Sequence, residues 1–373
     1  MTEKPTLLII GPTPPPYHGV AVAVETLMES DLRDSFHLVH LDLADRRGIA
    51  HVNNPDLHDV VLFIRQWCCL LGLLYRTRPT TTYLVMSQTT IGVLRDTFLM
   101  WPVLLAGSRV VAHLHGGHFK TWYESTAFVM KVYARIALTW IDRVIVLGES
   151  LRAQFEGLIP PDRITVVPNG IDVPAISTSN THREYSERYR VLHLSTLNRQ
   201  KGALVLLQAI PTILQARGNV EFVLAGPWSD PSDREEAMSL IHEHHLVSFV
   251  HLPGQVDSVH KLALLADADL FVFPGVQQEG QPLVVLEAMA AGLPIIYTNR
   301  GCLRETVIDG VSGLEVRCND PGHLAERILW LLDHPAERLR MGKAAQRRQQ
   351  QLFTKARHVE MMIKALQLVD NAA

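Results

Sequence analysis

Short runs of apolar residues alternate along this chain with longer segments in which apolar residues recur every three or four positions. The short runs are typical of buried strands, and the longer segments are typical of helices that cover a sheet. Strands and helices that alternate in this way form parallel sheets. Strands are predicted at residues 7–10, 38–41, 82–86, 110–113, 143–147 and 165–167, and again at 190–195, 221–225, 249–252, 270–273, 295–298 and 313–316.

The pattern is interrupted between residues 168 and 188, where glycine, prolines and a Ser/Thr/Asn cluster are typical of a linker. The chain has 373 residues, more than one hydrophobic core usually covers. We therefore predict an α/β protein with two Rossmann-like domains, at residues 1–175 and 176–350, and a C-terminal helix at 351–373 that packs back on the first domain. The carboxyl ends of both parallel sheets are expected to face each other across a ligand-binding cleft.

The most apolar stretch, at residues 60–75, has Arg65 and Gln66 at its centre. It is shorter than the ~20 apolar residues of a membrane-spanning helix. We interpret it as a core helix of the first domain, and the alternative is a helix that touches a membrane. The basic residues between 338 and 357 are interpreted as a charged, solvated helix face, and the alternative is a binding patch. Only four consecutive apolar residues precede Gly11, so no signal peptide is expected.

Composition narrows the range of partners. The formal net charge is −3, so no excess of cations favours nucleic acid. Residues 1–175 contain fifteen Lys and Arg and sixteen Asp and Glu, which gives that half no overall attraction to an anionic membrane. The four cysteines are scattered and form no CxxC pair, so neither a disulfide framework nor a zinc site is expected. This usage fits a cytoplasmic protein.

Two glutamates flank the start of a predicted helix in the segment EGQPLVVLE, which follows the strand at 270–273. Glu279 lies on the loop and Glu287 on the helix. A carboxylate can accept hydrogen bonds from a pair of sugar hydroxyls. Pro282 fits the first helical turn, and the free amides after it favour a phosphate. A ligand with both diols and phosphates is a nucleotide sugar.

This segment, followed by AMAAGLP, resembles the signature of the retaining glycosyltransferases of family 4, which have the GT-B fold. The proline-rich loop after the first strand, HLHGG, VVPNGID, the Lys-Gly turn and GQVD follow in the family's order over nearly the whole chain. The resemblance implies that Glu279 contacts the donor sugar and that Glu287 holds the ribose hydroxyls. It also implies that backbone groups at Leu283 and Val284 bind phosphate or sugar, and that Val256 contacts the base.

Lys201 lies on a second predicted strand-to-helix loop, where its ammonium can reach a phosphate and Gly202 lets the helix begin close by. The family usually has an arginine five positions before this lysine, and this chain has Thr196 there. Arg199 is a candidate for the missing guanidinium. The alternative is that Arg199 is a solvated turn residue.

The first predicted domain supplies two further candidates. Gly19 opens a helix after the proline-rich loop, and glycine there permits close approach of the backbone to a phosphate. The family commonly has two adjacent glycines, and this chain has His18 and Gly19. His115, before two glycines, matches the family's active-site histidine, which holds the donor sugar or the reacting hydroxyl. His113 is either part of the same site or a buried core histidine.

No metal or other cofactor is expected. His113 and His115 have no carboxylate or cysteine nearby in sequence, and Asp267 and Asp269 are interpreted as capping residues of a helix and the following strand rather than as a DxD metal motif. The glutamate pair could also suggest a glycosidase, but a glycosidase needs no phosphate site.

The resemblance implies transfer of a sugar with retention, without an enzymic nucleophile, to a glycan, a lipid-linked glycan or a small molecule, as in the synthesis of surface polysaccharides or glycoconjugates. The expected catalytic residues are His115, Lys201 and Glu279. Peripheral contact with the cytoplasmic membrane face is the expectation for a lipid-linked acceptor. The alternatives are a GT-B nucleotide-sugar 2-epimerase and a non-catalytic protein that binds sugar nucleotides.

Overall fold

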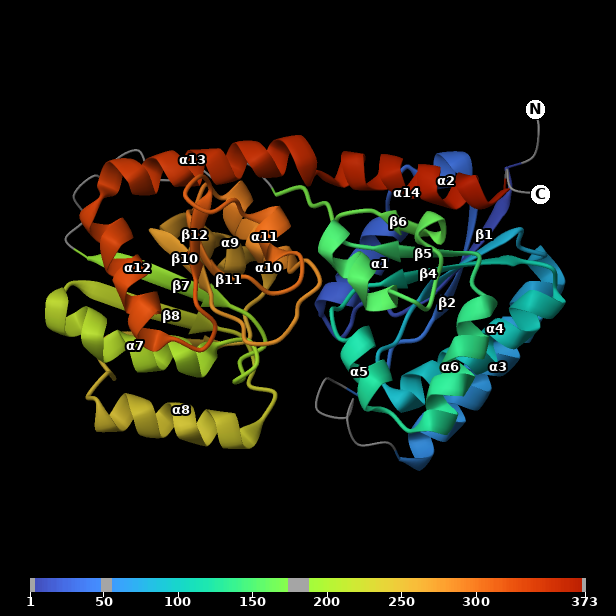
Figure 1. Cartoon of the computed structure of the whole chain (residues 1–373), viewed down its shortest axis with the longest axis horizontal. Helices are drawn as coiled ribbons and strands as arrows, with labels where there is room; N and C mark the ends of the chain where they lie inside the picture. Colours follow the sequence, from blue (N-terminus) through green and yellow to red (C-terminus); the bar gives the residue numbers. More distant parts are fainter. Residues whose placement is uncertain (1–3, 48–55, 174–187, 371–373) are drawn as a thin grey trace. The chain divides into compact units, whose positions relative to one another are not determined.

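The structure is a computed structural model that describes residues 4–47, 56–173 and 188–370. The chain divides into two compact units (Figure 1). The N-terminal unit comprises Met1–Asn169 and Lys355–Ala373, and the C-terminal unit comprises Gly170–Thr354. These divisions fall near residues 175 and 350, where the sequence places them. Most of the predicted linker, residues 174–187, lies outside the described residues.

The N-terminal unit contains a parallel sheet of six strands in the order β2-β1-β3-β4-β5-β6. The strands are β1 (Thr6–Gly11), β2 (His37–Asp42), β3 (Thr81–Val85), β4 (Arg109–Leu114), β5 (Arg143–Val146) and β6 (Ile164–Val166). The helices of this unit are α1 (Gly19–Met28), α2 (Leu32–Ser35), α3 (Leu57–Thr77), α4 (Thr90–Leu105), α5 (Phe119–Ser125), α6 (Phe128–Thr139) and α14 (Lys355–Asp370), with two short 3-10 helices at Glu149–Phe155 and Pro161–Arg163.

Helix α14 belongs to the N-terminal unit although it comes last in the sequence. It contacts α2, β3 and β4. Val359, Met362 and Leu366 are buried in the same cluster as Leu7 and Val24. The side chains on one face of α14 therefore complete a core that begins with the first strand.

The C-terminal unit contains a second parallel sheet of six strands, in the order β12-β11-β10-β7-β8-β9. The strands are β7 (Tyr189–Leu194), β8 (Val220–Ala225), β9 (Val250–Gly254), β10 (Leu270–Phe273), β11 (Ile295–Thr298) and β12 (Gly313–Val316). The helices are α7 (Ala203–Ala216), α8 (Pro231–Glu243), α9 (Ser258–Asp267), α10 (Leu283–Ala290), α11 (Leu303–Thr306), α12 (Pro321–Asp333) and α13 (Pro335–Leu352).

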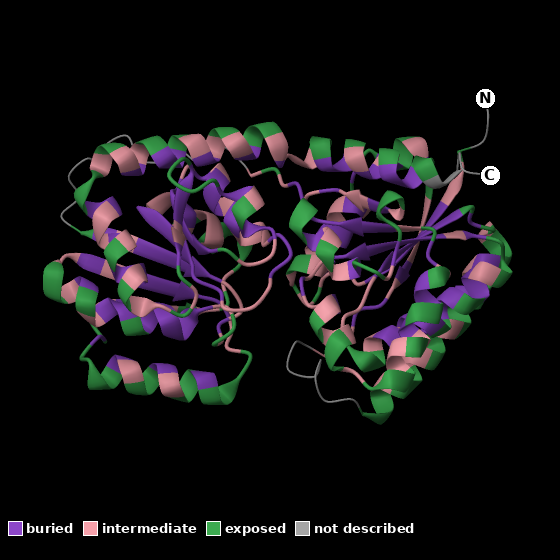
Figure 2. Cartoon of the chain, in the orientation of Figure 1, coloured by how far each residue is buried: buried purple, intermediate pink, exposed green. Residues whose placement is uncertain are grey.

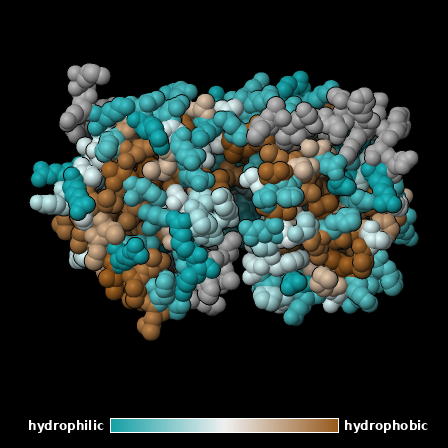
Figure 3. Space-filling model, turned by 180° about the vertical axis from the view of Figure 1, so that it is seen from behind, coloured by the Kyte–Doolittle hydropathy of each residue, from teal (hydrophilic) through white to brown (hydrophobic). Residues whose placement is uncertain are grey.

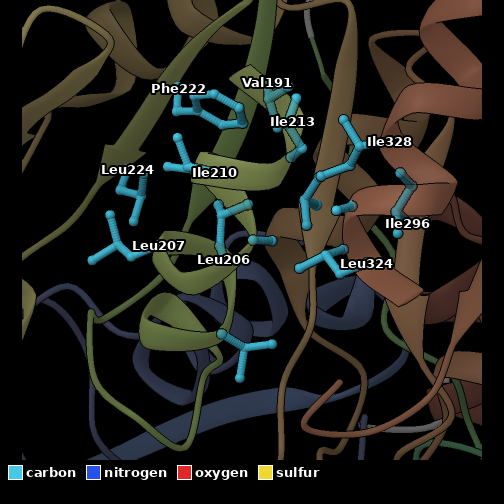
Figure 4. Packing of buried hydrophobic residues seen from close by; sticks show 14 of the residues in the cluster. Val191, Leu206, Leu207, Ile210, Ile213, Phe222, Leu224, Ile296, Leu324 and Ile328 are labelled. Carbon is cyan, nitrogen blue, oxygen red and sulfur yellow. The ribbon is translucent and has the colours of Figure 1, made fainter. Parts of the chain in front are cut away.

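The core of the C-terminal unit shows why this order is stable. Leu206 and Ile210 of α7 pack between Val191 and Phe222 of the sheet and Leu324 of α12 (Figure 4). All five side chains are fully buried. Because α7 follows β7 directly, its packing fixes where the loop between β7 and α7 leaves the sheet.

All twelve predicted strand segments contain a strand, so these predictions are confirmed. In the C-terminal unit, β7 pairs with β10, which is not its neighbour in sequence. The strand order reverses at this pair, and such a switch point brings two loops together at the carboxyl edge of a sheet. The loops after β7 and β10 carry Lys201 and Glu279.

The prediction of a core helix at residues 60–75 is wrong. Helix α3 extends over Leu57–Thr77, and its buried residues are Gln66, Leu70 and Leu74. Figure 2 shows long exposed stretches on α3 and α6, in contrast to the buried strands beside them. Among the described residues, α3 is the one helix long and apolar enough, by length and composition, to cross a membrane. Apolar periodicity marks a face of a helix, but it does not say whether that face turns toward the sheet.

Candidate active site

Lys201 and Glu279 form an ion pair at the switch point of the C-terminal sheet. The Nζ atom of Lys201 lies 2.6 Å from Oε1 and 2.7 Å from Oε2 of Glu279. The Gln277 side-chain amide donates a further hydrogen bond of 2.8 Å to Oε1. Glu279 is buried. Two residues 78 positions apart in sequence therefore form one charged group at one edge of the sheet.

The backbone of the two loops holds Lys201 in place. The Lys201 amide donates to Oδ1 of Asn198 at 2.8 Å, and the Val276 amide donates to the carbonyl of Gln200 at 2.8 Å. Gly202 has φ +85°, and a Cβ there would lie 2.2 Å from the Pro274 carbonyl oxygen. Only glycine accepts both conditions, and α7 begins directly after it, at Ala203.

A third loop, after β11, supports Glu279. Gly301 has φ +58°, and a Cβ at this position would lie 1.6 Å from the Glu279 carbonyl oxygen. The Gly301 amide donates to Oε1 of Gln278 at 2.7 Å. Neither Gly301 nor Gln277 is among the site residues that the sequence predicts. The signal for Gly301 is weak, a single glycine in a turn after a strand.

Glu287 lies on α10, and only one of its two carboxylate oxygens has a hydrogen-bond partner among the described residues. Its Oε1 accepts a hydrogen bond of 2.6 Å from Nζ of Lys261 on α9. Its Oε2 is buried and has no hydrogen-bond partner among the described residues. A buried carboxylate oxygen without a donor is unfavourable by ~1–3 kcal/mol or more. This oxygen is therefore suited to a hydroxyl group that arrives with a ligand.

The start of α10 differs by one position from the sequence prediction. Pro282 is not in the first turn but is the N-cap residue, with φ −64° and ψ 123°. Leu283 and Val284 occupy the first turn, where amides lack intrahelical acceptors and favour a negative charge. Both side chains are partly buried against the neighbouring core. The amides lie between Glu279 and Glu287 in sequence.

Val256 lies on the loop after β9. It lines a surface hollow of about 420 Å³ beside α9, together with Pro253, His260, Ala263, Leu264, Ala266 and Asp267. The side chain also packs on the core cluster that Leu283 and Val284 contact. The structure therefore places Val256 on the same side of the core as the start of α10.

Arg199 is not grouped with Lys201 and Glu279. Its Nε lies 3.4 Å from Oδ1 of Asp233, and its guanidinium also pairs with Glu236, both on α8. The side chain is 53% exposed. This placement favours the alternative of a solvated turn residue over a substitute for the arginine missing at Thr196.

His115 lies in the N-terminal unit, directly after β4, in a cluster with His113 and Tyr83. The Tyr83 hydroxyl lies 2.8 Å from Nδ1 of His113 and 3.2 Å from Nε2 of His115. The centroids of the two imidazole rings are 3.9 Å apart. His113 and Tyr83 are buried, which confirms the alternative of a buried histidine at 113.

The histidines of this cluster are neutral at physiological pH. Burial lowers the pKa of His115 to about 3, and His358 and His18 lower it further. Burial, then the neighbouring His115 and His358, holds the pKa of His113 well below its usual range. His115 can therefore donate or accept a hydrogen bond, but it does not supply a positive charge.

Gly19 is the first residue of α1, after the N-cap His18, whose Nδ1 accepts a 3.4 Å hydrogen bond from the Ala21 amide. A Cβ at Gly19 would meet no atom within 4 Å. The packing of the chain itself does not require glycine here. A role in close approach of a phosphate stays a prediction.

The two aspartates of the DxD-like sequence are structural. The Oδ2 atom of Asp269 accepts a hydrogen bond of 2.8 Å from the Arg190 amide, and Asp267 pairs with the Arg190 guanidinium. Within residues 4–47, 56–173 and 188–370, no three His, Cys, Asp or Glu side chains are grouped as metal ligands.

Two family descriptions match the chain in succession. "Glycosyltransferase Family 4" matches residues 31–174, and "Glycosyl transferases group 1" matches residues 177–348. The chain belongs to glycosyltransferase family 4. The matches extend over parts of both units and include every candidate residue named above except Gly19.

Solved structures show that this family 4 chain has the GT-B fold. HepE of Anabaena, solved in complex with UDP and glucose, has a TM-score of 0.76 and 18% identity, and the match covers 97% of this chain and 99% of that one. Sucrose-phosphate synthase of Thermosynechococcus elongatus has a TM-score of 0.77 and 18% identity, over 99% and 100% of the two chains.

A curated relative of this family 4 chain, phosphatidyl-myo-inositol mannosyltransferase of Mycobacterium leprae, is 29% identical over 239 residues. That match covers 62% of this chain and 60% of the relative. Glycogen synthase of Mycobacterium tuberculosis is 29% identical over 209 residues, 56% of this chain and 49% of the relative. The chain thus matches about half to three-fifths of the length of these relatives.

Proposed function

We propose that this protein transfers a glycosyl group from a nucleoside-diphosphate sugar to a hydroxyl acceptor. The observation that carries the proposal is the arrangement at the C-terminal switch point. There, the ion pair of Lys201 with the buried Glu279 is joined to a loop that leads into the free amides of α10 and into Glu287, which has one buried oxygen without a partner among the described residues. Complexes of HepE with UDP and UDP-glucose support a nucleotide sugar as the donor.

Each residue has a distinct role in this proposal. Glu287 accepts a hydrogen bond from a ribose hydroxyl at its free Oε2. The amides of Leu283 and Val284 bind the diphosphate or the sugar, Val256 contacts the base, and Glu279 orients the sugar hydroxyls. Neutral His115 contributes a hydrogen bond to a sugar hydroxyl, and Gly19 permits close approach to a phosphate.

Catalysis then depends on where charge is placed. The bond between the anomeric carbon and the diphosphate oxygen breaks, and the bond between that carbon and the acceptor oxygen forms. Negative charge develops on the leaving diphosphate, and Lys201 with the α10 amides stabilises it. The acceptor proton passes to the leaving phosphate oxygen, on the same face, so the anomeric configuration is retained. The chain's own cations perform this role, and we propose that no metal is needed.

The acceptor is a glycan, a lipid-linked glycan or a small molecule, and a role in the synthesis of surface polysaccharide or glycoconjugates follows. We propose a cytoplasmic location. No disulfide joins cysteines of the described residues, and Cys68 and Cys69 are exposed, which suits a reducing compartment.

Calorimetric titration with UDP, GDP and ADP tests the donor site. At least one diphosphate should bind the wild type, and Glu287→Gln should weaken that binding at least tenfold because a hydroxyl then loses a charged acceptor. Glu243→Gln, at the exposed end of α8, is the matched control and should leave binding unchanged. Absence of binding by all three diphosphates, or equal binding by Glu287→Gln and the wild type, would contradict the proposal.

Incubation with radiolabelled nucleotide sugars and candidate acceptors tests the transfer itself. Label should move to an acceptor, and NMR of the product should show the anomeric configuration of the donor. Release of an epimerised nucleotide sugar would instead indicate the 2-epimerase. Binding without transfer, and without slow donor hydrolysis, would indicate a non-catalytic binding protein.

A further inference from the structure

An exposed apolar surface covers one side of the N-terminal unit. Fifteen of the twenty-two exposed large hydrophobic side chains of the described residues lie on α3, α4 and α6. These helices are neighbours, since α4 contacts both α3 and α6 (Figure 1). Hydrophobic side chains are gathered over this part of the unit in the space-filling view (Figure 3). We call this surface the α3–α4–α6 face.

The apolar residues of this face follow the helical repeat and therefore form stripes. On α4, residues spaced by three and four positions are all exposed by a third or more. Helices α3 and α6 repeat the arrangement. The exposed members are Leu57, Val60, Val61, Ile64, Leu71 and Tyr75 of α3, Ile91, Leu94, Phe98, Trp101 and Leu105 of α4, and Phe128, Val129, Val132 and Ile136 of α6.

Side chains at this spacing normally face a protein core. Here each helix already contacts the unit through another face. The buried side chains of that other face include Leu70 and Leu74 of α3 and Val93 and Leu99 of α4. An exposed apolar patch of more than a few hundred Å² marks a contact surface for a partner or a membrane. The outward stripes of three adjacent helices thus need a partner that is broad and apolar.

The charges on the face identify the chemistry of that partner. The three helices carry five Lys and Arg and only two acidic residues, Asp59 and Asp96. Asp96 pairs with Arg95, and Asp59 pairs with Arg47, which Asp45 and Asp56 also contact. The remaining cations are Arg65, Arg76, Lys131 and Arg135, for which no ion pair is recorded within the described residues. The unneutralised charge of the face is therefore positive, although residues 1–175 as a whole carry nearly equal numbers of both signs.

We infer that the α3–α4–α6 face docks the protein on the surface of an anionic lipid bilayer. Apolar stripes bordered by Lys and Arg are the pattern of helices that lie in the plane of a membrane interface. Trp101 and Tyr75, 58% and 83% exposed, have the amphipathic rings that favour this depth. Because α3 is anchored by Leu70 and Leu74, it lies on the bilayer as part of the folded unit and does not cross it.

A second copy of the chain fits the face less well. Self-association through one twofold axis places the same patch of both copies in contact. The unpaired cations of one copy would then face those of the other, which is unfavourable. An anionic bilayer offers acyl chains to the apolar side chains and negatively charged headgroups to the cations. This inference stands on the surface alone and does not rest on the proposed sugar transfer.

Sedimentation with lipid vesicles tests the inference. The full-length protein should sediment with vesicles of phosphatidylcholine and phosphatidylglycerol, and less with phosphatidylcholine alone. Phe98→Asp and Trp101→Asp should each reduce the bound fraction at least tenfold, because a carboxylate is added to the apolar stripe. Replacing both Arg65 and Arg76 by Gln should lower binding to the anionic vesicles by about fivefold per cation removed. Raised salt should reduce this difference between the variant and the wild type.

The matched control is Val247→Asp, which places the same charge at a 70% exposed apolar residue of the C-terminal unit. It should bind vesicles like the wild type, and circular dichroism should show all variants folded. Wild-type protein that stays in the supernatant with both vesicle types, or equal binding by Phe98→Asp, overturns the inference. A wild-type dimer that Phe98→Asp separates, together with absence of vesicle binding, would identify the face as an interface between copies.

Fluorescence quenching measures the orientation directly. Vesicles with brominated acyl chains should quench the tryptophan emission of the wild type more than that of Trp101→Phe, which conserves the apolar character of the stripe. Equal quenching of the two proteins would place Trp101 outside the bilayer and would overturn the proposed orientation even if the protein bound vesicles.

Discussion

The two units share a plan of six parallel strands, but they use the carboxyl edge of the sheet differently. In the C-terminal unit the order reverses between β7 and β10, and the two loops there hold the Lys201–Glu279 ion pair. In the N-terminal unit β3 and β4 bring together Tyr83, His113 and His115, which carry no charge at neutral pH. One edge thus presents fixed charges, and the other presents neutral hydrogen-bonding groups.

This difference teaches how one fold supports two tasks. Fixed charges suit a diphosphate whose charge increases as its bond to the sugar breaks. Neutral imidazole and phenol groups suit the hydroxyls of a sugar, which carry no charge. The outer surfaces of the two units also differ. Most of the exposed large apolar side chains of the described residues lie on α3, α4 and α6 of the N-terminal unit.

The largest effect should come from breaking the support under Glu279. In Gly301→Ala the new Cβ would lie 1.6 Å from the Glu279 carbonyl oxygen at φ +58°. Strain and overpacking together should lower the free energy of unfolding of the C-terminal unit by about 3–5 kcal/mol. Gly310→Ala, at φ +70° with no atom within 4 Å, is the control and should lose only about 1 kcal/mol. Chemical denaturation measures both, and equal losses would show that the contact with Glu279 is unimportant.

The next largest effect, on turnover, should come from changing the charges at the carboxyl edge of the sheet in the C-terminal unit. Lys201→Met removes the cation next to the leaving diphosphate, and turnover should fall by roughly a hundredfold. Glu279→Gln should also reduce turnover. Because the two side chains form one pair, the double variant should lose less than the sum of the single losses. Steady-state kinetics of the three variants measure this coupling, and strictly additive losses would mean that the pair does not act as a unit.

A pH experiment compares the neutral edge with the charged one. Above pH 6.5 a buried histidine is neutral in both the folded and the unfolded chain and adds no pH dependence. Below pH 6.5 the unfolded chain binds protons that the folded chain does not, so the free energy of unfolding falls as pH falls. Each histidine whose pKa in the folded chain is well below 6.5 should lower the free energy of unfolding at pH 5.5 by about 1.4 kcal/mol.

In the described part of the N-terminal unit, burial lowers the pKa of four histidines, that of His113 well below its usual range, that of His115 to about 3, and those of His18 and His358 in the same direction. In the C-terminal unit, burial lowers the pKa of His193 to about 4. Hydrogen exchange at pH 7.0 and 5.5, corrected for the intrinsic rate, should show the greater loss of protection in the sheet of the N-terminal unit. A greater loss in the C-terminal sheet would mean that these histidines are protonated in the folded chain.

The smallest effect is expected for Arg199. Its guanidinium is half-exposed and pairs with Asp233 and Glu236, and exposed pairs contribute about 0–1 kcal/mol. Arg199→Ala should therefore change turnover by less than about threefold, far less than Lys201→Met. A loss as large as that of Lys201→Met would restore Arg199 as the replacement for the arginine missing at Thr196.

The sequence was a good guide to the strands and a partial guide to the site. Apolar runs predict strands because a parallel sheet is buried on both faces. The sequence also identifies Lys201 and Glu279 one by one, since each follows a strand. Their contact could not be predicted from spacing, because it depends on β7 lying next to β10 across 78 residues.

Two other features were beyond the sequence for different reasons. Gly301 has no periodic signal, and its importance comes from the backbone of another loop that lies against it. The stripe of Ile91, Leu94 and Phe98 has a clear signal, but the same spacing describes a face turned toward a core and a face turned away from it. The spacing therefore identifies the apolar face of the helix, but it does not show whether this face turns toward the core or toward the outside.

The position of α14 has a consequence for how the protein is made. Val359, Met362 and Leu366 fill the core around β1, so the first strand of the chain acquires its final neighbours only after residues 355–370 have been synthesised. The C-terminal unit, in contrast, is contiguous in sequence and can close as soon as its own residues have emerged. During translation, the half that begins first is therefore the half that finishes last, and a fragment ending at Asn169 would expose an unfilled apolar surface to chaperones and proteases.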